Sequence, residues 1–330
     1  MGLLKVSASP HIRHEDNTRV LMSDVIIAMI PLLIWGAYIF GLRVLTVTAV
    51  SVAACVIFEA LFNLILKKKI PVGDMSAVVS GMLLAFNLPA GIPLWIPVVG
   101  AFFAMIVVKG LFGGLGKNFM NPVLAARVFL FGSWPAHMTA YTEPLVRLPA
   151  FGALPEMAPD AVSSATTLTV LKEGALPGDN IFDMFIGNMK GCIGEISALL
   201  ILAGGLYLLV RRVITWHISV SFIATVALLT FIFAPDGISA FDYMLAELCS
   251  GGLMLGAVFM ATDYVTSPVT SKGRLIYGVG CGALTVFIRF LGGYPEGVSF
   301  AIIIMNLFVW YLDKATKPTK FGGGKANAKA

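Results

Sequence analysis

The run VIIAMIPLLIWGAYIF at residues 25–40 is followed, after a short break around Arg43, by VLTVTAVSVAACVIFEALFNLIL at residues 44–66. Apart from Glu59, neither run carries a charged side chain. About 20 apolar residues are enough for a helix to cross the hydrocarbon core of a bilayer. These two runs therefore predict two consecutive membrane-spanning helices.

The rest of the chain repeats this pattern, and its composition excludes a soluble globular domain. Hydrophobic residues make up 58% of the 330 positions and charged residues 12%, against roughly a quarter charged residues in soluble domains. A soluble chain of this length would need more polar residues to cover its core. Six further apolar runs predict membrane spans, at residues 94–108, 193–210, 213–234, 245–261, 275–290 and 298–312.

Two shorter apolar stretches, residues 75–88 and 118–131, are interrupted by Gly, Asn or Pro. By length alone such stretches suit re-entrant or half helices. With both counted as crossings, we expect an all-α integral membrane protein of about ten transmembrane helices. Residues 1–22 carry several charges and lack the apolar segment of a cleavable signal peptide, so we expect the first span to stay as an anchor.

The placement of Lys and Arg predicts the orientation. Cytoplasmic loops of membrane proteins accumulate basic residues. With a cytoplasmic N-terminus and both short stretches crossing, 17 of the 23 basic residues fall on the cytoplasmic side and 5 on the outer side, with Arg127 inside a span. We therefore expect a multi-pass protein of the cell membrane with both termini in the cytoplasm. The pI of 9.0 then needs no nucleic-acid partner to explain it.

Under this topology the longest loop, residues 132–189, lies outside the cytoplasm. It contains several prolines and charges of both signs, and it is long enough to hold a site. The predicted organisation is an N-terminal membrane repeat at residues 1–131, this extracytoplasmic loop at 132–189, a C-terminal membrane repeat at 190–313 and a basic cytoplasmic tail at 314–330.

The two membrane segments resemble each other. The stretch 81–87 ends one interrupted span and 256–263 ends its counterpart, and a Gly-Gly pair precedes both the fifth and the tenth helix. Because five crossings per half is an odd number, the second half would be inverted relative to the first. Interrupted spans at matching places in inverted halves point to a binding site near the midplane. The alternative is a chance alignment of apolar, Gly-rich segments.

Cysteine and histidine patterns do not indicate a metal or disulfide site. The four cysteines lie far apart at or within predicted spans, and we interpret them as small apolar residues. They are Cys55, Cys192, Cys249 and Cys281. The sequence shows no iron–sulfur motif, and GGLG at residues 113–116 lacks the strand and helix that flank a dinucleotide site.

The outer loop contains a run of small and hydroxyl residues, DAVSSATTLT at residues 160–169. On residue types alone, this run predicts either an accessible hydroxyl or a Ser/Thr turn that leads into a helix.

The run resembles the Asp-x-x-Ser-Gly-Ala-Thr motif at which a flavin transferase attaches FMN, through a phosphoester, to the last threonine. Asp160, Ser163, Ala165 and Thr166 match in order, and Ser164 stands at the usual glycine. Nearly the whole chain is also similar to the D subunits of the Rnf complexes, a family related to the B subunits of the sodium-pumping NADH:quinone oxidoreductases. The similarity includes GGLGKNFMNP at residues 113–122 and ATDYVTSP at 261–268.

This resemblance implies two inverted five-helix repeats with broken helices, a covalent FMN on Thr166 and a second, non-covalent riboflavin inside the same subunit. It implies a subunit of an ion-translocating ferredoxin:NAD⁺ oxidoreductase, a translocase, with no catalytic residue of its own. Electrons would pass to and from ferredoxin and NAD⁺ through other subunits of the complex. The sequence does not favour Na⁺ over H⁺ as the translocated ion.

Polar residues at membrane depth are further candidates, because they are costly there. We expect Asn118, Asn121 and Asp263, at the matched interruptions, to contact the second flavin or an ion. Glu59 and Arg127 suit interhelical pairing or snorkelling to the interface. A stand-alone channel or secondary transporter is the alternative function, because inverted halves with broken helices describe those folds equally well.

Overall fold

The computed structural model describes residues 17–68, 72–151, 167–177, 180–293 and 296–318. Within these ranges the backbone forms helices and loops and no β-strand, apart from an isolated antiparallel bridge between Pro89 and Cys192.

The first half of the chain contains α1 (Thr18–Phe40), α2 (Arg43–Ile65), η1 (Val72–Asp74), α3 (Ser76–Phe86), α4 (Trp95–Phe102), the π-helical η2 (Phe103–Gly110) and α5 (Pro122–Ser133). Three short helices follow, α6 (Pro135–Met138), α7 (Thr167–Lys172) and α8 (Ile181–Ile186). The second half contains α9 (Ala198–Val210), α10 (Trp216–Ile232), α11 (Ala240–Cys249), α12 (Leu253–Leu255), the π-helical η3 (Gly256–Met260), α13 (Ser271–Leu291) and α14 (Val298–Ala315).

Helix length and composition confirm the all-α membrane fold expected from the sequence. Four described helices are long and apolar enough to cross a bilayer: α1, α2, α13 and α14. Helix α11 and the segment α12–η3 meet the same criterion when they are taken together, and the two are bent by 64° relative to each other. A 23-residue helix such as α1 rises about 35 Å, which exceeds the ~30 Å hydrocarbon core. The number of crossings and the inverted relation of the halves stay predictions.

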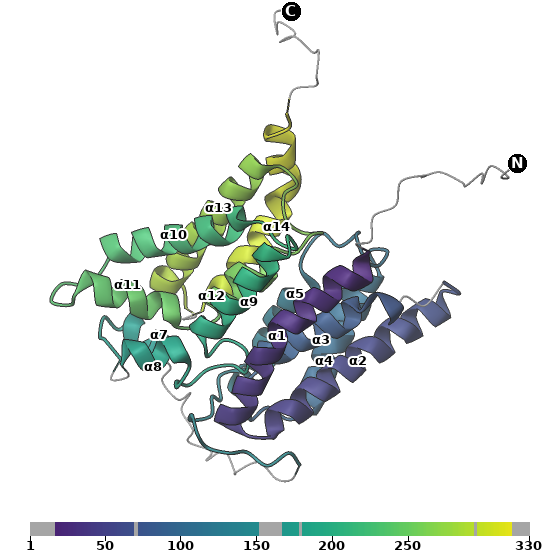
Figure 1. Cartoon of the computed structure of the whole chain (residues 1–330), viewed down its shortest axis with the longest axis horizontal. Helices are drawn as coiled ribbons and strands as arrows, with labels where there is room; N and C mark the ends of the chain where they lie inside the picture. The colour runs from purple at the N-terminus through teal and green to yellow at the C-terminus, as the bar shows by residue number, and fades with distance from the viewer. Residues whose placement is uncertain (1–16, 69–71, 152–166, 178–179, 294–295, 319–330) are drawn as a thin grey trace, which may run out of the picture.

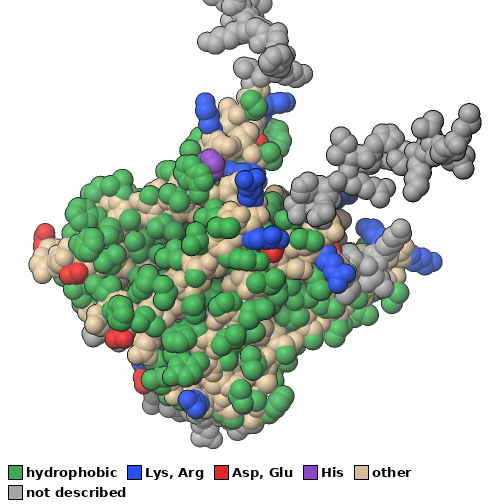
Figure 2. Space-filling view, in the orientation of Figure 1, with side chains coloured by type: hydrophobic (Ala, Val, Ile, Leu, Met, Phe, Trp, Pro, Cys, Tyr) green, Lys and Arg blue, Asp and Glu red, His purple; other side chains and the backbone are tan. Residues whose placement is uncertain are grey.

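The arrangement of the helices separates two faces. Figure 1 shows the start of α1 and the end of α14 toward one face, and α7 and α8 toward the other. Between them, large apolar side chains such as Ile34, Leu206 and Phe287 are exposed on the outside of the bundle. Figure 2 shows hydrophobic side chains over most of the visible surface, with many of the Lys and Arg side chains spread along the face that bears the end of α14 and the start of α1. This is the surface expected for contact with lipid.

Both halves contain a helix that stops inside the bundle. Helix α3 has 11 residues and rises about 16 Å, roughly half of a bilayer core. Helices α11 and α12 are separated at Ser250–Gly252, where Gly251 has a φ of +65°, a conformation that favours glycine. The side chain of Asn87, after α3, lies 3.7 Å from the sulfur of Met260 at the end of η3. The two half helices therefore end against each other.

The sequence places the start of one span too early. Residues 193–197 were expected to be helical, but α9 begins only at Ala198, where the hydroxyl of Ser197 caps the backbone N–H of Leu200. Instead, the backbone N–H of Ile193 donates to the carbonyl of Leu88, and that of Gly194 to the carbonyl of Phe86, both at 3.0 Å. This segment satisfies backbone groups that the end of α3 leaves unpaired.

Gly194 makes this crossing possible, which gives a test of the packing. A Cβ at Gly194 would lie 2.3 Å from the Cβ of the buried Phe86. We expect Gly194→Ala to lower the free energy of unfolding by about 1–3 kcal/mol, because overpacking forces the backbone apart. Thermal unfolding of the purified protein in detergent measures this loss. The matched control is Gly132→Ala in α5, where an added Cβ meets nothing within 4 Å; equal midpoints for the two variants would contradict the close crossing.

Candidate functional site

The predicted flavin-attachment motif lies outside the residues that the structure describes. This applies to Asp160, Ser163, Ser164, Ala165 and Thr166, so covalent attachment stays a prediction. The described chain resumes at Thr167, the first residue of α7.

Helix α7 is anchored on the second half of the bundle. Leu168 and Leu171 are buried, and the hydroxyl of Tyr243 in α11 donates to the carbonyl of Leu171 at 3.4 Å. The ammonium of Lys172 donates to the carbonyl of Gly292 after α13. The residues that directly follow the motif therefore have a fixed position at the face where α7 and α8 lie.

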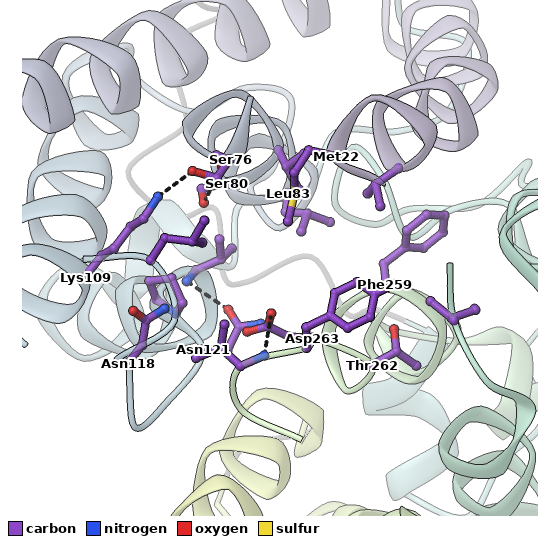
Figure 3. A pocket seen from close by; sticks show the side chains of 18 of the residues that line it. Met22, Ser76, Ser80, Leu83, Lys109, Asn118, Asn121, Phe259, Thr262 and Asp263 are labelled. Atoms are coloured by element: carbon purple, nitrogen blue, oxygen red, sulfur yellow. Dashed lines mark hydrogen bonds between the residues drawn. The ribbon is translucent and has the colours of Figure 1, made fainter. Parts of the chain in front are cut away.

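Asn118, Asn121 and Asp263, which the sequence places at matched interruptions, line a single cavity in the structure. We call it the inner cavity; its volume is about 90 Å³. Its walls come from both halves of the chain, and Figure 3 shows Asn121 and Asp263 close together with Phe259 and Thr262 beside them. The cavity also includes Ser76, Ser80 and Lys109. The structure thus brings Asn118, Asn121 and Asp263 to one cavity, and their function stays a prediction.

Each of the two asparagines has a distinct position in this cavity. The side-chain oxygen of Asn121 accepts from the backbone N–H groups of Val123 and Leu124 at 3.0 and 3.3 Å and so caps α5. Its amide nitrogen donates to the carbonyl of Met260 at 3.3 Å, which ties α5 to η3. Asn118 is buried, and its side-chain oxygen has no hydrogen-bond partner. A buried amide oxygen without a partner is costly, so Asn118 is available to accept a hydrogen bond from a ligand.

Lys109 contributes a buried charge to the same cavity. It lies in η2, and its ammonium is 2.6 Å from a carboxylate oxygen of Glu59 in α2 and 2.8 Å from the hydroxyl of Ser76. The pairing of Glu59 with Lys109 confirms the interhelical interpretation of Glu59. Both π-helical segments, η2 and η3, contribute residues to the inner cavity, and π-helical turns occur frequently at functional sites.

Asp263 completes the polar wall of the inner cavity. One of its oxygens accepts from the hydroxyl of Thr266 at 3.1 Å, and the side chain is only partly buried. The cavity therefore combines an unpaired amide oxygen, a carboxylate and apolar side chains such as Leu83 and Phe259. A mostly apolar cavity with a few convergent polar groups is typical of a small-molecule site.

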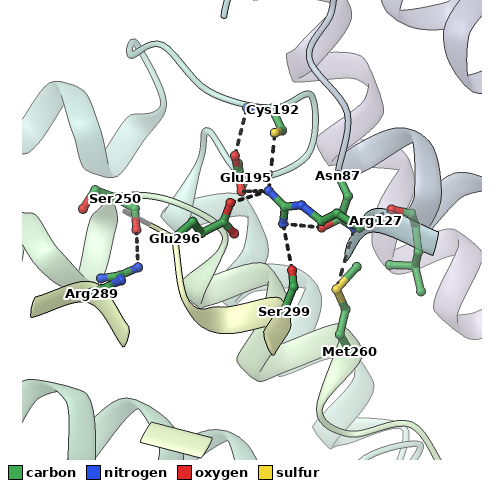
Figure 4. Close-up of polar contacts among 10 residues, drawn as sticks. Asn87, Arg127, Cys192, Glu195, Ser250, Met260, Arg289, Glu296 and Ser299 are labelled. Carbon is green, nitrogen blue, oxygen red and sulfur yellow. Dashed lines mark hydrogen bonds and ion pairs between the residues drawn. The ribbon is translucent and has the colours of Figure 1, made fainter. Parts of the chain in front are cut away.

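A second polar group, the outer cluster, surrounds Arg127 (Figure 4). Its guanidinium donates to the side-chain oxygen of Asn87 at 2.7 Å and pairs with Glu296 at 2.5 Å. Glu195 lies 3.7 Å from the same guanidinium. Pairing between segments is therefore confirmed for Arg127. Glu195 and Glu296 were not singled out from the sequence, since each stands alone in its stretch, and only the fold brings them to Arg127.

Two more ion pairs flank the outer cluster. Arg289 and Glu247 form a buried pair at 2.5 Å between α13 and α11. Lys190 and the exposed Glu143 pair at 2.8 Å, and the hydrogen bond from Lys190 holds the pKa of the Glu143 carboxyl below its usual range.

Comparisons with known proteins give a consistent result over the whole chain. Residues 5–322 match the model of the NQR2, RnfD, RnfE family. The D subunit of a Na⁺-translocating ferredoxin:NAD⁺ oxidoreductase complex from Acetobacterium woodii is 46% identical, with 99% of this chain and 98% of the relative covered. The D subunit of a proton-translocating ferredoxin:NAD⁺ oxidoreductase complex from Clostridium ljungdahlii is 39% identical, with 97% of both chains covered. The D subunit of an ion-translocating oxidoreductase complex from Stutzerimonas stutzeri is 37% identical over 92% of this chain and 91% of the relative.

Proposed function

Since the chain belongs to the NQR2, RnfD, RnfE family, we propose that it is the flavin-carrying membrane subunit of an ion-translocating ferredoxin:NAD⁺ oxidoreductase complex. The observation that carries this proposal is the match to relatives of that name over almost the full length. The chain is a subunit of a translocase and not an enzyme alone. Its partners are the other subunits of the complex.

The first flavin in this proposal is an FMN joined to Thr166 by a phosphoester. The support is the order of Asp160, Ser163, Ala165 and Thr166 in the sequence, together with the firm anchoring of α7 directly after them. A flavin transferase would make the attachment. A bound flavin exchanges one or two electrons, and the protein positions it and tunes its potential. Electrons would come from ferredoxin and pass to NAD⁺ through partner subunits, because the sequence has no nicotinamide or iron–sulfur motif.

The second flavin is a non-covalent riboflavin, for which the inner cavity is our candidate site. The groups that line the cavity suit the polar edge and the faces of the ring, and the volume of about 90 Å³ is smaller than the whole riboflavin molecule, so part of that molecule would extend beyond the cavity. The unpaired side-chain oxygen of Asn118 would accept a hydrogen bond from a ring N–H, and Phe259 and Leu83 would contact the ring faces. Asp263 and Asn121 would orient the ligand at the junction of the two halves.

The orientation in the membrane is also part of this proposal. We place both termini in the cytoplasm and residues 132–189 outside, as the distribution of Lys and Arg favours. The names of two relatives differ in the ion, Na⁺ in one and protons in the other, so the proposed ion is a monovalent cation, Na⁺ or H⁺. The alternative of a stand-alone channel or transporter finds no support in relatives whose names describe subunits of a complex.

Covalent attachment is tested by substitution at Thr166 in a host that supplies the flavin transferase. We expect Thr166→Ala to abolish the ultraviolet-fluorescent band near 35.2 kDa on a denaturing gel. The amount of protein in the membrane should stay the same, because loss of one loop hydroxyl changes stability little. Thr167→Ala is the matched control and should keep the band. A band that survives Thr166→Ala and vanishes with Thr167→Ala would place the attachment one residue later.

The inner cavity is tested by its flavin content. We expect Asn118→Ala and Asp263→Asn each to weaken riboflavin binding about tenfold, as expected for the loss of one hydrogen bond, while the fluorescent band at Thr166 persists. Acid-extracted flavin per mole of purified complex measures this. Asn63→Ala is the control, because Asn63 donates to Glu59 of its own helix and does not line the cavity. Wild-type flavin content in both cavity variants would remove the inner cavity as the site.

Orientation is tested by thiol labelling in intact cells. The four native cysteines are buried, so background reaction should be small. Glu173 and Lys68 are both exposed. We expect Glu173→Cys to react with a membrane-impermeant maleimide in intact cells, and Lys68→Cys to react only after lysis. The reverse pattern would overturn the proposed orientation.

A further inference from the structure

The outer cluster borders a small cavity that the proposed flavin sites do not use. This outer cavity has a volume of about 30 Å³. It is lined by Tyr141, Thr167, Lys190, Gly251, Glu195 and Glu296, among others. One water-sized group needs ~10–15 Å³ of such volume, so the outer cavity has room for a small ion with a water molecule and not for an organic ligand.

The charges around the outer cavity do not balance. Lys190 lines the cavity, and two more basic side chains lie in or beside the outer cluster. Each of the three has its own close carboxylate: Arg127 with Glu296, Arg289 with Glu247, and Lys190 with Glu143. Glu195 is a fourth carboxylate. Its basic neighbour is Arg127 at 3.7 Å, and that guanidinium is already engaged at 2.5 Å by Glu296. With all seven groups ionised, the site lacks one positive charge.

Glu195 is also buried and incompletely bonded. It is 4% exposed. Its Oε1 accepts from the backbone N–H of Cys192 at 3.0 Å, whereas its Oε2 accepts no hydrogen bond. A buried carboxylate with an unsatisfied oxygen is strongly unfavourable unless a proton or a cation joins it.

The free oxygen of Glu195 lies close to an oxygen of Glu296. A Cβ at Gly252 would lie 2.7 Å from Oε2 of Glu195 and 2.6 Å from Oε1 of Glu296. Both oxygens therefore lie within 2.7 Å of the same point. The distance between the two oxygens is at most twice that value. Gly252 has no side chain to fill this space. Two carboxylate oxygens that border one such space can both coordinate a hard cation, and a proton on either carboxylate would remove the surplus charge.

We propose that Glu195 and Glu296, beside Arg127 and Gly252, form a binding site for one small monovalent cation, H⁺ or Na⁺, that opens to the outer cavity. The single missing charge sets the charge of the ligand, and the cavity volume sets its size. The site lies next to Thr167, at the face that bears α7. It deepens the proposed function by giving this chain a cation site of its own. It rests on the described residues and not on flavin attachment, so the two proposals fail separately.

The test is carboxyl modification of the purified whole complex by a hydrophobic carbodiimide, which reacts with protonated carboxyl groups. The labelled fraction of the peptides that contain Glu195 and Glu296 is measured by mass spectrometry, in choline buffer from mildly acidic to mildly alkaline pH, with and without NaCl. If the site binds Na⁺, Na⁺ at ten times its dissociation constant reduces labelling about tenfold, because roughly one-tenth of the sites stay free. If it binds only H⁺, labelling falls as pH rises and Na⁺ has no effect.

Either of these results supports the site and identifies its cation. Labelling that neither pH nor Na⁺ changes, or no labelling of either residue at any pH, overturns the proposal. The exposed Glu173 is the internal control for a general effect of salt on the reagent.

A variant tests whether the two carboxylates act together. Glu195→Gln removes the surplus negative charge and leaves Arg127 paired with Glu296. We expect Glu296 then to stay ionised, so that its labelling becomes low and insensitive to Na⁺. Glu173→Gln, the matched exposed substitution, should leave the wild-type response. A Glu296 response that survives Glu195→Gln would mean that the residues do not form one site. The labelling of the wild-type complex decides the proposal even if the variant fails to assemble.

Discussion

The guanidinium of Arg127 joins four segments that the chain brings into the bilayer separately. It projects from α5 and reaches Asn87 at the end of α3, the sulfur of Cys192 in the irregular segment before α9, and Ser299 and Glu296 at the start of α14. A helix that stops at membrane depth leaves carbonyl groups and a polar end that lipid cannot solvate. Since α3 and η3 both stop inside the bundle, their ends need such a polar partner within the protein. The interrupted helices, and the cavities beside them, depend on this contact.

The two cavities differ because different chemistry covers the two sides of the junction. On the inner side, Lys109 and Glu59 neutralise each other, and the remaining polar groups are amides, hydroxyls and one partly exposed carboxylate. Around the outer cavity, the carboxylate without a basic partner of its own, Glu195, is buried and has an oxygen that accepts no hydrogen bond. An apolar cavity with hydrogen-bonding groups suits a ring, and a small site with a buried, unneutralised carboxylate suits a cation. The same pair of half helices thus separates two cavities with different linings.

The sequence was sufficient for the class of fold and for three of the residues that line the inner cavity. Asn118, Asn121 and Asp263 could be predicted as neighbours, because each stands beside an interruption of an apolar run and such interruptions face one another in repeated folds. Glu195 and Glu296 could not. Each stands next to a glycine and looks like an ordinary loop residue in the sequence. The contact between them arises only when residues 191–195 pair with the end of α3. The late start of α9 has the same cause. Residues 193–197 directly precede an apolar run, but the backbone N–H groups of Ile193 and Gly194 bond the carbonyls at the end of α3 instead of continuing that helix.

Because Arg127 links the interrupted helices through its guanidinium, it also determines the charge of the outer cluster. Removing a buried guanidinium would leave Asn87 without its donor and two carboxylates without a cation, and an uncompensated buried charge is more costly than the loss of a hydrogen bond. A lysine would keep the charge, but a single ammonium lacks the planar fork that reaches Asn87 and Glu296 from its two terminal nitrogens at once. The fold therefore requires an arginine at this position. That arginine pairs closely with Glu296 and lies farther from Glu195, so it neutralises only one of the two carboxylates. The unneutralised carboxylate of Glu195 is a consequence of how the half helices are held together.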